Sequence, residues 1–246
     1  MHVKRNSLWA ALFVGPALFL TGFYLLYPSA QTIWLSLMDG RSINFVGLDN
    51  YKFAFSSNVM LQAFRNNLIW LIVFTSSTVV FGLIMAIIFD RVRYESVAKT
   101  AIFMPMAISF VGAGIIWKFM YAYKPATGDQ IGLLNQLMVS AGAEPQGWLI
   151  YGPLMNNLAL IAVGVWTWTG FCMVILSAAY KGIPKELLEA ATVDGASDLQ
   201  RLRYIVLPFM GSTIAVVAVT MIVTMTAILF AAISFVYKKN RLSDDA

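Results

Sequence analysis

The chain has 246 residues, of which 59% are hydrophobic and only 12% are charged. This is more apolar surface than a water-soluble domain of this length could bury. The 17 Lys and Arg residues exceed the 12 Asp and Glu residues, giving a formal net charge of +5, but they are spread over short connections, which excludes nucleic acid as an expected partner. A single cysteine, Cys172, and a single histidine, His2, exclude an internal disulfide and the usual metal sites.

Apolar runs of about 20 residues can cross the hydrocarbon core of a bilayer as helices. Four such runs are clear, namely 8–26, 68–89, 101–123 and 158–180. We expect each to be one helix, because an open strand leaves backbone groups unpaired in lipid. A fifth, uncharged stretch, 206–237, is too long for one ordinary span and too short for two. One strongly tilted helix, or a span followed by a re-entrant or interfacial piece, both fit it.

Basic residues indicate which ends of these spans lie in the cytoplasm, because short loops rich in Lys and Arg tend to stay there. They precede the first span, fill the connection after the second and follow the fourth: Lys4, Arg5, Arg91, Arg93, Lys99, Lys181, Lys185, Arg201 and Arg203. The pattern predicts a cytoplasmic N-terminus and a first run that stays as an anchor instead of being cleaved as a signal. The basic C-terminal residues Lys238, Lys239 and Arg241 conflict with five crossings, which would place them outside.

The acidic residues are informative through their position, since all twelve lie outside the apolar runs. Proton-coupled carriers and intramembrane enzymes need buried acids, bases or metal ligands. We therefore expect no catalytic residue, no metal site and no cofactor in this chain. The energy for any uphill transport must come from another protein.

Four residues in or beside the spans are candidates for a solute path. Trp166 and Trp168 could stack on the apolar face of a sugar, and Asn157 could bind its hydroxyl groups, although Trp also packs helix bundles. Residues two apart point to different helix faces, so at most one of the two Trp side chains is expected to line a cavity. Lys118, near the outer end of its run, either extends to the membrane interface or donates to solute in a pore.

The segment 182–208, between the last two apolar stretches, predicts two short helices joined at a corner. Pro184 suits a first helical position, and Glu186 and Glu189 place negative charge in the early turns, where it complements the helix dipole. An apolar stripe of Leu187, Leu188 and Ala191 makes this helix amphipathic.

The corner itself is predicted at Gly195, because glycine readily adopts the left-handed backbone that ends a helix. Ser197 and Gln200 form a capping-box pattern that begins the second helix, which is expected to run toward the membrane until Pro208. A bent element with one charged face and one apolar stripe is suited to docking in a groove of a partner. An ordinary interfacial connection is the alternative interpretation of these residues.

This segment resembles the EAA signature of permease subunits of binding-protein-dependent ABC importers. The residues that match at the expected spacing are Glu189, Ala190, Ala191, Gly195, Ile205, Leu207 and Pro208. In that family the segment is the coupling helix, which inserts into a cleft of the ATPase subunit. The resemblance implies this coupling role for Glu189, Ala190, Ala191 and Gly195, with Asp194 beside them.

Further stretches resemble the sugar-importing branch of the same family. They are 45–51 in an outer loop, 65–66 before the second span and 182–186 before the signature. The fourth span and the preceding 148–151 are most similar to permeases for α-glucosides. The likeness covers roughly residues 8–215. Beyond it we find neither the outer segment nor the sixth span that this branch carries.

The resemblance implies an all-α, polytopic transmembrane helix bundle of the ABC importer permease type, with five of the six apolar segments expected for the family. Residues 1–246 would form one transmembrane permease domain, in a bacterial or archaeal cytoplasmic (inner) membrane. It would translocate a carbohydrate, an α-glucoside or related oligosaccharide, by alternating access.

The implied partners are two ATPase subunits that hold ATP and Mg, a second permease subunit, a periplasmic or lipid-anchored solute-binding protein and membrane lipid. Two alternatives remain: an ABC permease for a non-sugar solute such as an amino acid or polyol, and a truncated permease fragment that binds the ATPase without forming a pore.

Overall fold

The computed structural model describes residues 2–125 and 130–244, and side chains from residue 12 to residue 226 within those ranges. The side chains of the basic residues near both ends, such as Lys4 and Lys238, therefore lie outside the description. In the described part of the chain helices predominate and no strand forms beyond a single bridge between Met38 and Phe45. This confirms the all-α prediction. Contacts divide the chain into two units, Met1–Arg65 and Asn66–Ala246.

The first unit is a helical rod followed by a loop and two shorter helices. The rod is α1 (His2–Thr21), the π turn η1 (Gly22–Leu26) and α2 (Tyr27–Ser36), and α3 (Asp49–Ser56) and the start of α4 (Asn58–Ile69) follow. The amide of Asn50 donates to the carbonyl oxygens of Ser36 and Met38, at 2.9 and 2.7 Å, which ties α3 to the end of α2.

Asp39 organises the loop after α2. Its carboxylate accepts from the backbone N–H of Ile43 at 2.9 Å, from the Asn44 amide at 2.9 Å and from the backbone N–H of Arg41 at 3.2 Å. These hydrogen bonds favour the charged form, so the backbone N–H of Ile43, and next the Asn44 amide, lower the pKa of Asp39.

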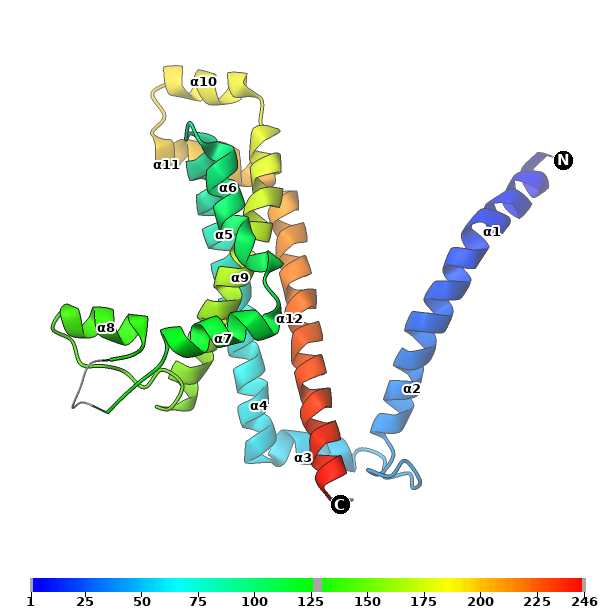
Figure 1. The fold of residues 1–246 in the computed structure, drawn as a ribbon. Helices are drawn as coiled ribbons and strands as arrows, with labels where there is room; N and C mark the ends of the chain where they lie inside the picture. The colour runs from blue at the N-terminus through cyan, green and yellow to red at the C-terminus, as the bar shows by residue number, and fades with distance from the viewer. Residues whose placement is uncertain (1, 126–129, 245–246) are drawn as a thin grey trace. The chain divides into compact units, whose positions relative to one another are not determined.

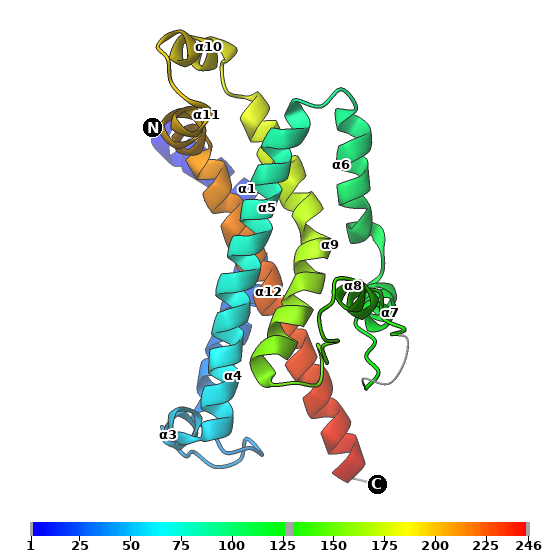
Figure 2. The same ribbon diagram turned by 90° about the vertical axis from the view of Figure 1, so that its left-hand side faces the viewer.

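The second unit holds the longest helices (Figure 1). In chain order its elements are η2 (Trp70–Phe74), α5 (Thr75–Asp90), α6 (Glu95–Phe103), η3 (Met104–Ala107), α7 (Phe110–Met120), α8 (Leu133–Ser140), α9 (Pro153–Lys181), α10 (Lys185–Val193), α11 (Asp198–Arg201), η4 (Leu202–Val206) and α12 (Leu207–Asp244). Figure 2 shows α5, α9 and α12 side by side, with α6 along α9. The ends of α5 and α9, and the starts of α6 and α12, lie near α10 and α11.

Small residues let these helices approach closely, as in other membrane bundles. A Cβ atom at Gly82 of α5 would lie 2.6 Å from the Cβ of Cys172 on α9. A Cβ atom at Gly170 of α9 would lie 2.4 Å from the carbonyl oxygen of Ile102 on α6. The core between α5, α9 and α12 is filled by apolar side chains that are fully buried, three of them methionines: Phe74, Met173, Leu176, Met210, Val217 and Met221.

The prediction of one continuous helix over 101–123 is wrong. The chain bends by 102° between Glu95–Ala107 and Phe110–Met120. Pro105 has no N–H to donate and lies in the 3₁₀ turn η3. Ser109 then adopts an extended backbone, and its hydroxyl accepts from the N–H of Gly112 at 3.1 Å, so it caps a new helix.

Of the stretch 206–237, Val206 ends the π turn η4 and the rest lies in one continuous helix, α12, which has 38 residues and is about 57 Å long. Pro208 does not end the helix as predicted. It lies in the first turn of α12, directly after the π turn η4, in a run that is helical from α11 onward. The C-terminal end of α12 lies at the opposite end of the bundle from α10 (Figure 1).

Four helices among the described residues are long and apolar enough to cross a membrane, or five when the bent pair counts as one span. They include the run from α4 to α5, α9, and the first part of α12 with its preceding turns. The five apolar segments predicted from the sequence therefore correspond to these helices, one of them broken.

Candidate coupling site

The segment predicted to couple to a partner forms the outermost end of the second unit (Figure 1). Its first helix, α10 (Lys185–Val193), begins one residue later than predicted, because Pro184 is the N-cap residue and not the first helical residue. Glu186 places a negative charge in the first turn, as predicted from the helix dipole. Ile183 is buried and Leu188 packs against the core, so one side of this segment is fixed to the bundle.

The corner after α10 is built by backbone hydrogen bonds around Gly195. Gly195 has a φ of +77°, the left-handed region predicted for it. Its N–H donates to the carbonyl oxygen of Thr192 at 3.1 Å, and the N–H of Ala196 donates to that of Ala191 at 2.9 Å. These two bonds define a Schellman motif, which satisfies the last carbonyl groups of α10.

The second helix begins with the predicted capping box. The N–H of Ser197 donates to the side chain of Gln200 at 2.7 Å, and the N–H of Gln200 donates to the Ser197 hydroxyl at 3.3 Å. From this start α11, η4 and α12 continue without a break into the core. The corner is thus linked through continuous helical backbone to the longest helix of the bundle.

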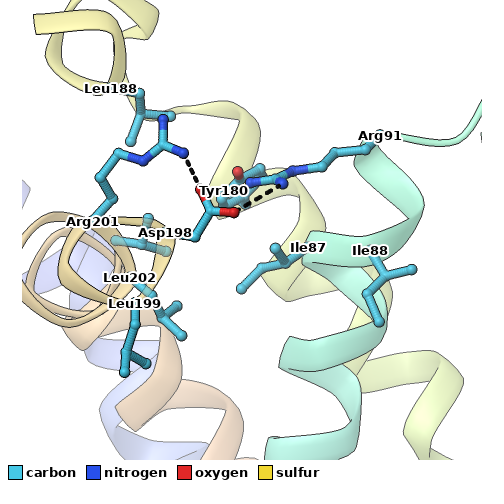
Figure 3. A pocket seen from close by; sticks show the side chains of 10 residues that line it. Ile87, Ile88, Arg91, Tyr180, Leu188, Asp198, Leu199, Arg201 and Leu202 are labelled. Atoms are coloured by element: carbon cyan, nitrogen blue, oxygen red, sulfur yellow. Dashed lines mark hydrogen bonds and ion pairs between the residues drawn. The ribbon is translucent and has the colours of Figure 1, made fainter. Parts of the chain in front are cut away.

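Charged side chains join this corner to the neighbouring helices (Figure 3). The guanidinium of Arg201 donates to the Thr192 hydroxyl on α10 and pairs with Asp198. The other carboxylate oxygen of Asp198 lies 3.9 Å from the guanidinium of Arg91 at the end of α5. The network therefore connects α10, α11 and α5.

Beneath this network lies a cavity of about 350 Å³. Its lining is mainly aliphatic and comes from α5, α9, α10, α11 and η4, including Ile87, Ile88, Leu188, Leu199 and Leu202. The space between the corner and the ends of the spans is thus incompletely filled by side chains.

A second group of charges lies where α5, α6 and α9 end or begin. The ammonium of Lys181 is 2.6 Å from the carboxylate of Glu95 and 3.9 Å from that of Asp90. Lys99 pairs with Glu95 and donates to the Ser177 hydroxyl on α9. In the sequence, Lys99 and Lys181 indicated only the side of the membrane, because pairing across helices leaves no signal in a single sequence.

The predicted coupling residues lie together on α10 and at its end. Glu189, Ala190, Asp194 and Gly195 are exposed, and Ala191 is partly buried. Together they present polar side chains and a small apolar surface that a groove of another protein could cover.

The two tryptophan candidates for a solute path have different surroundings. Trp166 lines a cavity of about 220 Å³, together with Phe81, Pro105 and Thr169. Trp168 packs against the core, with its ring centroid 6.0 Å from that of Phe171 in an edge-on arrangement. The two rings therefore occupy different faces of α9.

Lys118 and Asn157 are not among the lining residues of the Trp166 cavity. Lys118 is exposed in the last turn of α7, beyond the bend, so it does not lie inside a long span. Asn157 accepts from the indole N–H of Trp70 at 2.9 Å and donates to the carbonyl oxygen of Pro153 at 2.8 Å, which joins η2 to α9. The four candidates do not form one site.

A row of aromatic rings beside Trp166 was not identified from the sequence. The centroid of Trp117 lies 5.7 Å from that of Trp166 and 5.1 Å from that of Tyr121, which in turn lies 5.9 Å from Trp148. The indole N–H of Trp117 is buried and has no hydrogen-bond partner among the residues that the structure describes. The spacing of Trp117 and Tyr121 on one helical face was the available signal.

Several known proteins have sequences similar to that of this chain. Residues 78–243 match the family of binding-protein-dependent transport system inner membrane components. The osmoprotective compounds uptake permease protein GgtC of Synechocystis is 55% identical over 212 residues, which cover 86% of this chain and 76% of GgtC. The alpha-glucoside transport system permease protein AglF of Rhizobium meliloti is 48% identical over 215 residues, 87% of this chain and 64% of AglF.

A solved structure shares the fold. A chain of a bacterial ABC transporter involved in the import of the acidic polysaccharide alginate superposes with a TM-score of 0.70 at 22% identity, over 94% of this chain and 77% of that one. The family match also extends to residue 243, so the family likeness does not stop near residue 215 as expected. The chain belongs to the binding-protein-dependent transport system inner membrane components, the multi-pass permease subunits of ABC importers.

Proposed function

We propose that this chain is the permease subunit of an ATP-driven importer that moves a carbohydrate across the inner membrane by alternating access. The observation that carries the proposal is the position of α10. This helix lies at one extreme end of the bundle, where Glu189, Ala190 and Asp194 are exposed. Through Gly195 it is joined to the helical run that becomes α12.

In this mechanism two ATPase subunits bind ATP and Mg and close on each other. A groove on one of them holds α10, so closure displaces the corner and tilts α12 against α5 and α9. The bundle then changes from inward-open to outward-open, and a periplasmic or lipid-anchored binding protein delivers the solute. This chain contributes no group to hydrolysis, and a second permease subunit completes the pore.

We place the α10 end of the bundle in the cytoplasm. We also place the N-terminus there, because the basic residues Lys4 and Arg5 precede the first apolar run. Four basic residues lie at the α10 end, namely Arg91, Lys99, Lys181 and Arg201. Basic residues are typical of cytoplasmic connections. The C-terminal end of α12 then lies on the outer side, despite its basic residues, because α12 is one continuous helix.

A carbohydrate is favoured as solute by two observations. The relative AglF, 48% identical, is named for alpha-glucoside transport. Trp166 offers an indole beside a cavity, which suits the apolar face of a sugar ring. The second candidate is an osmoprotective compound that is not a sugar, such as a polyol or an amino acid, because GgtC, 55% identical, is named for osmoprotective compounds.

Docking of α10 is tested by co-purification with the ATPase subunit. Deleting residues 186–194 is expected to abolish association. Ala190→Trp adds bulk to an exposed position of α10 and should also reduce the yield of ATPase, whereas Ala143→Trp, exposed in the loop after α8, should not. Normal ATPase yield with both α10 variants would refute docking at this helix.

Solute identity is tested in proteoliposomes that contain the complete transporter and its binding protein. ATP-dependent uptake of an α-glucoside, at a rate above that of polyols and amino acids, is expected. Preference for a polyol or an amino acid would favour the second candidate. Lack of uptake of every solute, with ATPase still bound, would favour the truncated, non-transporting permease.

A further inference from the structure

The corner between α10 and α11 is a weak point in the proposed transmission of movement. Gly195 has no side chain, and no atom lies within 4 Å of the position its Cβ would occupy. Apart from the two backbone hydrogen bonds of the Schellman motif, rotation about the backbone of Gly195 is therefore opposed by few contacts. If nothing else held this corner, a displacement of α10 would bend the chain there instead of reaching α12.

One side chain spans the corner. Arg201 follows Gly195 by six residues, at the end of α11, and its guanidinium donates to the hydroxyl of Thr192, which precedes Gly195 by three residues. The same guanidinium pairs with Asp198, which fixes its orientation. The Thr192 hydroxyl in turn donates to the carbonyl oxygen of Leu188 at 2.7 Å, so the connection reaches one turn further into α10.

Apolar packing at this corner is incomplete, although Leu188 and Leu202 both pack against the core. The cavity of about 350 Å³ lies between Leu188, Leu199 and the end of α5, and the side chain of Leu199 is 72% exposed. In contrast, the side chain of Arg201 is only 23% exposed. The side-chain contact that joins the two arms of the corner is thus the polar one between Arg201 and Thr192. Asp198, on the same arm as Arg201, holds the guanidinium in place (Figure 3).

We propose that Arg201 is a positioning residue that braces the corner, so that α10 and the start of α12 move as one body. This inference rests on the proposed coupling function. Arginine suits the role because its planar guanidinium presents several donors in a fixed geometry and can hold Thr192 and Asp198 at once. A lysine ammonium is a flexible point charge and cannot keep the same two partners in a fixed arrangement.

The test uses the complete transporter in proteoliposomes and measures the amount of solute imported per ATP hydrolysed. Arg201→Lys keeps the charge, and Thr192→Val keeps the shape of the side chain but removes the hydroxyl. Each is expected to lower solute imported per ATP by about tenfold, the order expected for loss of one hydrogen bond to a charged group. Assembly and basal ATP hydrolysis should stay at wild-type levels.

Two control variants make the result specific. Arg203→Lys changes an exposed arginine two residues away, whose guanidinium lies over the ring of Tyr204 at 5.8 Å, and should leave the import ratio within about twofold of wild type. Thr192→Ser retains the hydroxyl and should restore most of the ratio lost in Thr192→Val. The double variant Arg201→Lys with Thr192→Val should be no worse than either single variant, because both remove the same contact.

The possible outcomes distinguish a failure of the proposed positioning role of Arg201 from a failure of the proposed transport function. Wild-type complex that hydrolyses ATP without import would refute the proposed function itself. Wild-type import with unchanged ratios in Arg201→Lys and Thr192→Val would refute the brace alone. Loss of assembled complex in both variants would also refute it, because a positioning residue affects the coupling ratio and not assembly.

Discussion

Replacement of Gly195 by valine should uncouple ATP hydrolysis from import. The φ of Gly195 is +77°, and an L-residue in this left-handed region loses about 1–2 kcal/mol relative to glycine, with more expected for a β-branched side chain. Because about 1.4 kcal/mol corresponds to a tenfold change in population, the native corner should become about 5- to 30-fold less favoured. The space around the missing Cβ is open, so this penalty arises from the backbone and not from a clash.

The assay compares Gly195→Val with Gly195→Asn in the complete transporter in proteoliposomes. Asparagine tolerates the left-handed region better than other non-glycine residues, so import per ATP should stay within about threefold of wild type. Valine should reduce it by about tenfold or more. Equal import per ATP in wild type and in Gly195→Val, with normal assembly, would show that the corner has no role in coupling.

Three further predictions concern other parts of the chain. Gly170→Val should lower thermal stability in detergent by about 1–3 kcal/mol, since its Cβ would meet backbone atoms of α6. Gly114→Ala, in open space within α7, should instead raise it by up to about 1 kcal/mol, and equal melting temperatures of the two variants would contradict this packing. Trp166→Ala should reduce import more than assembly, and Trp168→Ala should mainly reduce stability; unchanged import in Trp166→Ala would return that ring to a packing role. The pKa of Asp39 is lowered, so the ionised carboxylate stabilises the loop after α2 above its ordinary pKa near 3.8, and this stabilisation is lost as the pH falls through the lowered pKa. Opening of residues 39–44, measured by hydrogen exchange, should increase over that pH range in the wild type but not in Asp39→Asn.

Local signals predicted the corner of the coupling segment well. Gly195 adopts the expected left-handed backbone, and Ser197 with Gln200 forms the expected capping box. Both depend on residues within a few positions of each other, so a single sequence contains the necessary information. The same holds for the hydropathy that identified the spans.

Helix breaks were predicted less well, because local signals such as proline and helix caps compete there with the hydropathy of the run. Pro105 and the Ser109 cap broke a run whose average hydropathy favoured one helix, whereas Pro208 was accommodated in the first turn of α12. Contacts between distant residues, such as Arg91 with Asp198 and Lys99 with Ser177, arise only when α5, α6, α9 and α11 come together. Such contacts carry no periodic or local signature.

The central claim, that α10 is the cytoplasmic contact for an ATPase, can be tested with one introduced thiol. Cys172 is fully buried, so Ala190→Cys provides an exposed thiol on α10 in a chain whose own cysteine is shielded. We predict that a membrane-impermeant maleimide labels this thiol in inverted membrane vesicles, is blocked there by bound ATPase, and fails to label it in spheroplasts. Labelling in spheroplasts, or labelling in vesicles that the ATPase does not reduce, would contradict the account.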